Sequence, residues 1–266
     1  MTSKSEYYFN GTFCSLRNKQ TCDFYKDSTG KNVNVAVIDS GWNLNLRDSR
    51  VKEGLGLVDP NDELSLKRNN NFSDKNGHGT AVTDLILRIA PDVTIYPVKV
   101  FGKRLETSVN ILIEAILWCV SNEIKIINLS LGTLLPDALE PLYKACEIAR
   151  RKGLIIISAK SNSETYSYPS IFENSIGVET GQFENIFEFE YLQDEATECI
   201  AKGMHDDLCY STGDRIRLAG NSFAAPVITG YLSLLMELKG GFELDTARIF
   251  LQEYYNYIME INHGNS

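Results

Sequence analysis

Three separated segments of the chain hold residue types that together could catalyse acyl transfer. Asp39 lies in VAVIDSG (residues 35–41), His78 in NGHGT (76–80) and Ser222 in GNSFAAP (220–226). A serine hydroxyl is almost fully protonated at neutral pH, so it attacks a carbonyl only when a neighbouring base removes its proton. A histidine can be that base, and a carboxylate can fix its tautomer and stabilise the imidazolium. We therefore expect Ser222 to be the nucleophile, His78 the general base and Asp39 the orienting carboxylate.

Each of these residues also has a common structural role when it is taken alone. A serine at the start of a helix is often its N-cap, and an aspartate after a strand is often a turn residue. His78 is the best of the three histidines as a base, because its flanking glycines let another backbone pack closely. His205 lies in an acidic, irregular segment and His263 near the end of the sequence. The combination of the three motifs favours the catalytic interpretation.

Alternating strand and helix patterns indicate how these residues are positioned. Short β-branched or apolar runs predict strands, and longer apolar-periodic stretches predict helices of about 10–17 residues. The predicted strands are 32–38, 93–100, 124–129 and 154–157, and the predicted helices are 78–87, 108–121, 136–152, 222–238 and 244–259. This alternation is typical of a parallel α/β sheet with helices on both faces, which binds ligands at the carboxyl ends of its strands. Asp39 follows the first predicted strand.

The three motifs, in the order Asp, His, Ser, resemble those of the subtilisin-like serine peptidases, the subtilase family. Subtilisin itself is the established example of that order. The resemblance covers about residues 32–238. It implies a three-layer subtilisin-like α/β fold, with a central, mainly parallel sheet and helices on both faces. It also implies a serine endopeptidase that hydrolyses peptide bonds through an acyl-enzyme.

The resemblance extends to segments that would bind the substrate. Residues 128–132 (NLSLG) resemble the family's substrate-binding strand, which implies that Ser130, Leu131 and Gly132 bind an extended peptide through the backbone. Residues 155–162 resemble the following strand and loop, whose last residue in the family is the oxyanion-hole asparagine. This likeness assigns that role to Asn162 and places Ala159 and Ser161 beside the substrate. As the alternative, an asparagine after a strand is often a plain turn residue.

Several positions depart from the family pattern. Asn221 and Phe223 stand where the family usually has threonine and methionine, and Ser161 stands where it usually has glycine. None of them supplies the attacking or proton-transferring group, so we expect an active enzyme. The altered context leaves two alternatives open. One is a non-catalytic pseudopeptidase that binds peptides, and the other is an acyl-transferring peptide ligase or cyclase using the same residues.

Neither cofactor nor metal is expected. The stretch between His78 and Pro91 is too short for the loop that carries the main calcium site in secreted members of the family. The six cysteines contain no CxxC pair and are expected to be free thiols, with Cys119 and Cys146 in the core. The spacing of Cys199, His205 and Cys209 matches no common zinc site.

The composition predicts one domain, and the resemblance implies that this is a peptidase domain, residues 32–266, after an N-terminal arm, residues 1–31. A net charge of −9 argues against nucleic-acid or anionic-membrane partners and favours neutral or basic substrates, or it only aids solubility. The family resemblance implies a peptide or protein substrate. Residues 1–9 lack the apolar core of a signal peptide, so the chain is predicted to be cytoplasmic, unless a targeting segment has been removed from it. The oligomeric state is not predicted.

An acidic insert, residues 183–207, is not matched by the family pattern. It carries eight acidic side chains with Lys202 as its only lysine, and its alternating aromatic residues suggest an exposed strand or hairpin arm. It could border the cleft and favour basic peptides, or it could be a solvated loop remote from the cleft.

The resemblance to the subtilase family and the predicted cytoplasmic location together lead us to expect a selective intracellular processing protease, for example one that removes the leader of a ribosomally made peptide.

Overall fold

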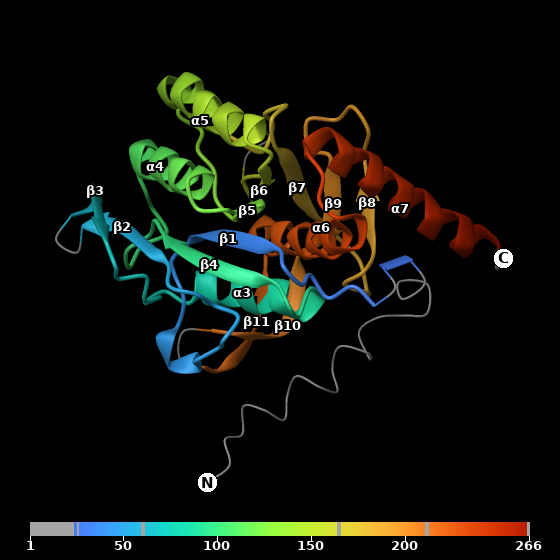
Figure 1. Cartoon of the computed structure of the whole chain (residues 1–266), viewed down its shortest axis with the longest axis horizontal. Coiled ribbons are helices and arrows are strands. Elements are labelled where there is room, and N and C mark those ends of the chain that lie inside the picture. The colour runs from blue at the N-terminus through green and yellow to red at the C-terminus, as the bar shows by residue number, and fades with distance from the viewer. Residues whose placement is uncertain (1–23, 26, 60–61, 164–165, 211–212, 265–266) are drawn as a thin grey trace, which may run out of the picture.

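The computed structural model describes residues 24–25, 27–59, 62–163, 166–210 and 213–264. Within these residues a sheet of nine strands crosses the centre of the molecule, in the order β3-β2-β4-β1-β5-β6-β7-β9-β8 (Figure 1). Neighbouring strands are parallel except at the two edges, where β3 and β8 run antiparallel to β2 and β9. The strands are β1 (Asn34–Asp39), β2 (Leu55–Asp59), β3 (Asp62–Asn69), β4 (Thr94–Lys99), β5 (Ile126–Leu129), β6 (Ile155–Ala159), β7 (Ile176–Gly181), β8 (Phe189–Tyr191) and β9 (Cys199–Lys202).

Helices cover both faces of this sheet and make a three-layer α/β fold, as predicted (Figure 1). One face carries α3 (His78–Ile89), α6 (Ala225–Lys239) and α7 (Leu244–Gly264), and the other carries α4 (Val109–Val120) and α5 (Leu139–Arg151). A separate hairpin of β10 (Met204–Cys209) and β11 (Arg215–Ala219) packs beside α3. Three short 3-10 helices complete the described elements: η1 (Leu44–Leu46), η2 (Pro136–Ala138) and η3 (Asn221–Phe223).

The central strand β1 shows why the sheet is buried on both sides. Its side chains alternate between the two faces, with Val35 and Val37 in the core under α3 and α6, and Ala36 and Ile38 in the core under α4 and α5. A strand covered on both faces must be apolar almost throughout. Asp39 at its end is therefore an exception, and it is also fully buried.

The order of the parallel strands creates a switch point at β1. The chain leaves β1 and reaches β4 on one side through α3, and from β4 it passes to β5 on the other side of β1 through α4. In such sheets the crevice at the carboxyl ends of the strands beside the switch point is the usual ligand site. Asp39 ends β1, Ser130 follows β5 and Asn162 lies just after β6, so the fold gathers these predicted residues along one edge.

The acidic insert belongs to the main sheet and does not form a projecting arm. It contributes β8 and β9 at the sheet edge and the start of β10. The alternating aromatic side chains Phe187, Phe189 and Tyr191 are buried, with Phe187 and Phe189 packed on Tyr231 of α6, while Glu190 is exposed. The expected exposed arm is therefore corrected to an edge strand, because α6 and α7 cover the aromatic face of the alternating pattern.

Most of the predicted N-terminal arm lies outside the described residues. The part that is described packs on the domain: Tyr25 is fully buried and stacks on Tyr231. The backbone N–H groups of Thr29, Gly30 and Lys31 all donate to one carboxylate oxygen of Glu237, at 2.6, 2.7 and 3.1 Å. The domain boundary at residue 32 stays a prediction.

Candidate active site

The carboxylate of Asp39 holds the imidazole of His78. His78 Nδ1 lies 2.8 Å and 2.9 Å from the two carboxylate oxygens of Asp39. Asp39 is fully buried, and its Oδ1 also accepts the N–H of Ser40 at 2.7 Å. Because a carboxylate only accepts, Nδ1 of His78 must carry a proton, and Nε2 of the neutral ring is then free to accept one.

The beginning of α3 places His78 against the end of β1. Gly79 packs so closely that an added Cβ would lie 2.5 Å from the carbonyl oxygen of Gly41 and 3.1 Å from Cβ of Asp39. The buried carboxylate of Asp74 accepts hydrogen bonds from the N–H groups of Asn76, Gly77 and Thr80, and from the hydroxyl of Thr80. Asp74 thus supplies acceptors that the free N–H groups at a helix start require.

Two carboxylates control the proton affinity of His78. Burial of the ring lowers its pKa, but the charge and hydrogen bond of Asp39, together with the charge of Asp74, raise that pKa above the usual value. Only the neutral imidazole can accept a proton from a serine. Any activity that uses His78 as a base must therefore decline as the pH falls through this raised pKa.

We predict that Asp74→Asn shifts the acid limb of kcat/KM to lower pH, because it removes one of the negative charges that stabilise the imidazolium. The measurement is the pH profile of kcat/KM between about pH 5 and 9 for the native protein and the variant, around the ordinary histidine pKa of about 6.5. Asp92→Asn changes an exposed carboxylate beyond the C-terminal end of α3; it is the control for loss of a distant charge and should leave the limb in place. An unchanged limb in Asp74→Asn would contradict the assignment.

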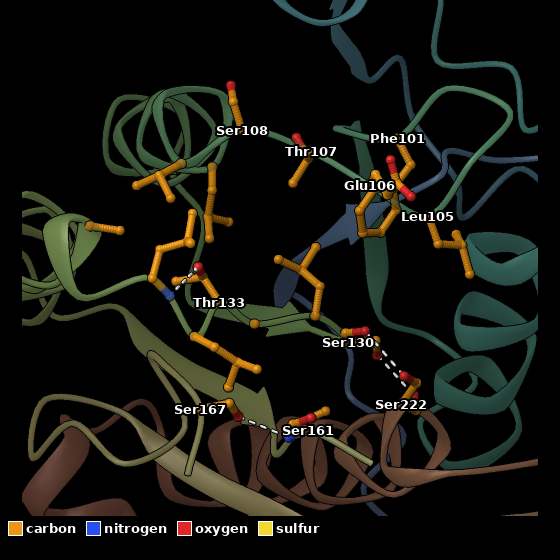
Figure 2. A pocket seen from close by; sticks show the side chains of 18 of the residues that line it. Phe101, Leu105, Glu106, Thr107, Ser108, Ser130, Thr133, Ser161, Ser167 and Ser222 are labelled. Atoms are coloured by element: carbon orange, nitrogen blue, oxygen red, sulfur yellow. Dashed lines mark hydrogen bonds between the residues drawn. The ribbon is translucent and has the colours of Figure 1, made fainter. Parts of the chain in front are cut away.

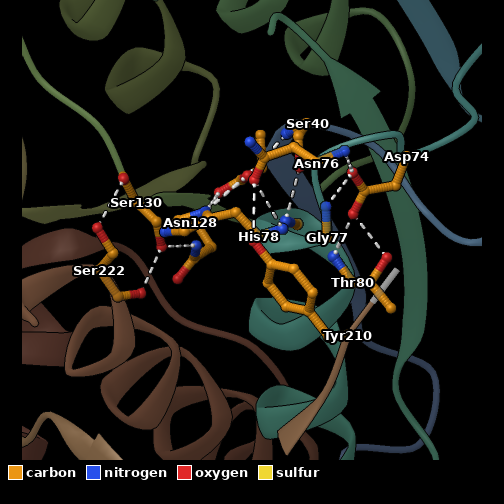
Figure 3. A network of polar contacts seen from close by, with 12 residues as sticks. Ser40, Asp74, Asn76, Gly77, His78, Thr80, Asn128, Ser130, Tyr210 and Ser222 are labelled. Carbon is orange, nitrogen blue, oxygen red and sulfur yellow. Dashed lines mark hydrogen bonds and ion pairs between the residues drawn. The ribbon is translucent and has the colours of Figure 1, made fainter. Parts of the chain in front are cut away.

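Ser222 lies in the turn η3, directly before α6, and is half-buried. It forms a reciprocal pair with Ser130: Ser222 Oγ donates to the carbonyl oxygen of Ser130 at 3.1 Å, and Ser130 Oγ donates to the carbonyl oxygen of Ser222 at 2.8 Å (Figure 3). Asn128 continues this network, since its Nδ2 donates to Ser130 Oγ and its Oδ1 accepts the hydroxyl of Thr229. The turn that carries Ser222 is thus tied to the end of β5.

Ser222 and His78 approach one another without sharing a hydrogen bond among the described contacts. The ring of Phe223 lies 5.2 Å from that of His78, which brings the turn up against the imidazole. Ser222 Oγ is bonded instead to Ser130 (Figure 3). Proton transfer from Ser222 to Nε2 of His78 would therefore require this side chain to rotate away from Ser130.

Asn162 is oriented by the residue that precedes Ser222. Its Oδ1 accepts the backbone N–H of Asn221 at 2.8 Å. Since a backbone N–H can only donate, this contact identifies the oxygen end of the amide and leaves Nδ2 free of any partner within the described chain. The N–H of Ser222 likewise has no acceptor among the described residues. These two donors can bind a developing oxyanion.

A cleft of about 790 Å³ runs past these groups. Ser130 and Ser222 lie at one end of it and Ser108 at the other (Figure 2). All of the residues predicted to bind substrate line it, together with His78, Ser222 and Asn162: they are Ser130, Leu131, Gly132, Ala159 and Ser161. Asp39 does not line it and lies buried behind His78. The sequence-predicted site is therefore gathered at one cleft.

The acidic insert is separate from this cleft. None of the described lining residues comes from residues 183–207. The insert's strands β8 and β9 lie at the edge of the sheet, beyond β7. Of the two interpretations drawn from the sequence, this placement favours the solvated element remote from the cleft.

The described cysteines are free thiols, as predicted. Cys119, Cys146, Cys199 and Cys209 are all buried, and burial raises the pKa of the Cys146 thiol to about 12. Cys14 and Cys22 lie outside the described residues. No group of three or more His, Cys, Asp or Glu side chains in the described part of the chain is arranged to hold a metal ion. The expected absence of calcium stays a prediction.

Sequence reasoning missed three residues of this site: Asp74, Asn221 and Tyr210. Tyr210 packs its ring against Gly77, and its hydroxyl lies 3.5 Å from Oδ1 of Asn76 (Figure 3). The role of Asp74 could have been predicted from the sequence, because a short acidic side chain just before a helix often accepts hydrogen bonds from the first N–H groups of that helix. Tyr210 had none, because its contact depends on how the hairpin β10–β11 packs on α3.

His205 contacts the short helix η3 that carries Ser222. It is buried, and its Nε2 lies 2.8 Å from the carbonyl oxygen of Lys202 and 3.2 Å from that of Phe223. Burial, with the positive charges of Lys202 and Arg88, lowers the pKa of His205 to about 4, although its hydrogen bonds to the two carbonyls oppose this shift. His205 is thus a structural histidine that remains neutral in the folded protein above that pH.

We predict that His205 makes the fold acid-sensitive. Because its folded pKa lies below its unfolded value, its contribution is fully present above about pH 6.5 and is lost as the pH falls towards 4, on the order of 3 kcal/mol in all. His205→Gln keeps an N–H donor without a titrating group, so its Tm should fall less steeply than the native Tm between pH 6.5 and 4.5. Parallel Tm curves for the two proteins would contradict this role.

The comparisons with known proteins agree with this geometry. A model of the Subtilase family matches residues 30–253. The chain is 29% identical over 221 residues to Subtilisin Savinase of Lederbergia lenta, covering 79% of this chain and 78% of that protein. The chain is also 29% identical over 221 residues to an alkaline protease of Alkalihalobacillus alcalophilus, covering 79% of this chain and 55% of that protein. The chain therefore spans about half the length of that relative.

Solved structures show the same fold. S41 psychrophilic protease superposes with a TM-score of 0.71 at 23% identity, covering 85% of this chain and 84% of that one. A cold-adapted subtilisin-like serine proteinase gives 0.68 at 21% identity, covering 84% and 81%. Within the described residues, none of the helices combines the length and the apolar character needed to cross a bilayer. With a family match over most of its length and this fold, the chain belongs to the subtilase family of subtilisin-like serine peptidases.

Proposed function

We propose that this chain is an active serine endopeptidase that cleaves peptide bonds through an acyl-enzyme. The observation that carries the proposal is the imidazole of His78, held at 2.8 Å and 2.9 Å by the buried Asp39 and lining the same cleft as Ser222. A histidine held in this way beside a serine in a cleft is an arrangement that activates the hydroxyl.

The mechanism follows from the positions of these groups. Ser222 Oγ leaves Ser130, gives its proton to Nε2 of His78 and attacks the peptide carbonyl. Negative charge then develops on the carbonyl oxygen, where Nδ2 of Asn162 and the N–H of Ser222 can stabilise it. The imidazolium, stabilised by Asp39, returns the proton to the leaving amine, and a water activated by His78 then releases the acid from Ser222.

The substrate would bind as an extended strand along residues 130–132. This segment follows β5 and lines the cleft, and its backbone can pair with a peptide as one further strand. The lining beyond it is largely apolar, with Leu105, Leu134 and Leu135 exposed near the cleft. Ala159 and Ser161 also line the cleft.

We further propose that the enzyme is a selective intracellular processing protease. Two observations support this finer role. The Epidermin Leader Peptide Processing Serine Protease of Staphylococcus aureus superposes with a TM-score of 0.68 at 20% identity, covering 85% of this chain and 69% of that one. The four described cysteines are free, as is usual in reducing compartments.

Two measurements test the proposal. A fluorophosphonate probe should label the native protein and not Ser222→Ala, because it reacts only with an activated serine. Failure of the native protein to label would indicate the non-catalytic peptide-binding alternative. Incubation with a diverse peptide library, followed by mass spectrometry, should then show a narrow set of cut sites for a processing enzyme. Ligated or cyclised products in place of cut peptides would indicate the acyl-transfer alternative.

A further inference from the structure

The side chain of Asn221 sits at the junction of three segments around the nucleophile. It is 6% exposed. Its Oδ1 accepts the N–H of Thr180 in β7 at 2.8 Å, and its Nδ2 donates to the carbonyl oxygens of Lys160 and Ser161 at 3.1 and 3.0 Å. Its own backbone N–H donates to Oδ1 of Asn162 at 2.8 Å. Every polar group of the amide is therefore used.

These contacts fix the loop that carries Asn162. The loop leaves β6 at Ala159, the N–H of Ser161 donates to Ser167 Oγ at 2.8 Å, and Asn162 itself is exposed to the cleft. Asn221 binds the two carbonyls just before Asn162, and it binds the oxygen of the Asn162 amide through its backbone. Asn221, the residue before Ser222, therefore holds this loop in place through hydrogen bonds to Lys160, Ser161 and Asn162.

Gly220 lets the two asparagines come this close. Its φ of +139° lies in a region that side-chain-bearing residues rarely adopt. An added Cβ would lie 3.3 Å from Oδ1 and 3.4 Å from Nδ2 of Asn162, so the amide lies directly against the glycine. The side chain of Asn162 therefore packs directly on the backbone of Gly220, two residues before Ser222.

We infer that Asn221 is a positioning residue for oxyanion binding, acting through Asn162. It fixes the distance between the two donors that would bind the oxyanion, Nδ2 of Asn162 and the N–H of Ser222. Such donors stabilise the transition state only when they are already aimed at the position of the charge, and a misplacement of about 1 Å can cost 100-fold in rate. The inference rests on the peptidase activity proposed above.

A merely structural role would give a different result from a positioning role. Loss of a buried asparagine lowers stability wherever it occurs, since it leaves buried partners unpaired. Loss of positioning lowers kcat in molecules that remain folded, and only as long as Asn162 is there to be positioned. The two roles are separated by combining the Asn221 change with a change at Asn162.

The test is a double-mutant cycle with Asn221→Ala and Asn162→Ala on one peptide substrate. Kcat is expressed per serine that reacts with a fluorophosphonate, so that only folded active sites count. We expect Asn221→Ala alone to lower kcat by about 10-fold to 100-fold with little change in KM. In the Asn162→Ala background the same change should cost less than about threefold, because the group it positions is gone. Asn221→Ser is the second variant if alanine prevents folding, because its one hydroxyl cannot replace two donated bonds and one accepted bond.

Asn174→Ala is the matched control. Asn174 is also buried, at 1% exposed; its Nδ2 donates to the carbonyl oxygen of Tyr143, and it does not line the cleft. It should lower Tm and leave kcat unchanged. Equal losses from Asn221→Ala in both backgrounds, or an unchanged kcat, would overturn the inference while the native enzyme still cleaves and labels. A native protein that neither cleaves nor labels would instead refute the peptidase activity itself.

Discussion

Replacing Ser222 by alanine should abolish turnover, with kcat lowered by about 10⁶, the loss found for the corresponding change in subtilisin itself. The reason is that the hydroxyl forms the covalent bond to the substrate. The hydroxyl of neighbouring Ser130 cannot easily replace it, because it donates to the carbonyl oxygen of Ser222 and accepts a hydrogen bond from Nδ2 of Asn128. The measurement is single-turnover and steady-state cleavage of a peptide identified from the library.

His78→Ala and Asp39→Asn should also reduce kcat by several orders of magnitude, about 10⁴ for a change that alters the histidine tautomer. Asparagine at position 39 would present an N–H₂ group to Nδ1 of His78, which favours the ring with its proton on Nε2. That tautomer cannot accept the proton of Ser222. The double variants should lose little beyond Ser222→Ala, since the three groups act as one unit.

The controls for this series lie outside the cleft. Ser121→Ala changes an exposed serine at the end of α4 and should retain native kcat and KM. Tm should be recorded for every variant, so that loss of activity is not confused with loss of folding. Native-like cleavage by Ser222→Ala would exclude the proposed mechanism.

Much of this site could be predicted because it depends on short segments of sequence. Asp39 follows an apolar run, and a strand covered on both faces delivers its last residue to the edge where ligands bind. His78 stands between glycines, and Gly79 is indeed the residue that packs on Gly41. Local pattern and local structure agree at these positions.

The residues that were missed depend on contacts between distant segments. Asn221 is bonded to Lys160, Ser161 and Thr180, which lie 61, 60 and 41 positions away along the chain. No local pattern reports such partners, and from sequence Asn221 was only a departure from the family's usual residue. The aromatic residues of the acidic insert were misplaced for the same reason, since their partners lie on α6 and α7.

Replacing Asn162 by alanine should lower kcat by about 10² to 10³, the loss found when this kind of oxyanion donor is removed from subtilisin. The fall should be in kcat with KM nearly unchanged, because the donor gains its strength only as charge develops on the carbonyl oxygen. The acid limb of the pH profile should stay in place, since the carboxylates that raise the pKa of His78 are Asp39 and Asp74.

Asn162→Asp gives a sharper form of the same prediction. One carboxylate oxygen can still accept the N–H of Asn221, so the side chain keeps its orientation. The other oxygen then stands where Nδ2 was, and it would repel the developing oxyanion instead of binding it. We therefore expect Asn162→Asp to be slower than Asn162→Ala, although it is the closer replacement in shape, while Ser163→Ala on the same loop keeps native kcat. If Asn162→Asp retained more activity than Asn162→Ala, the amide nitrogen would not be the group that meets the oxyanion.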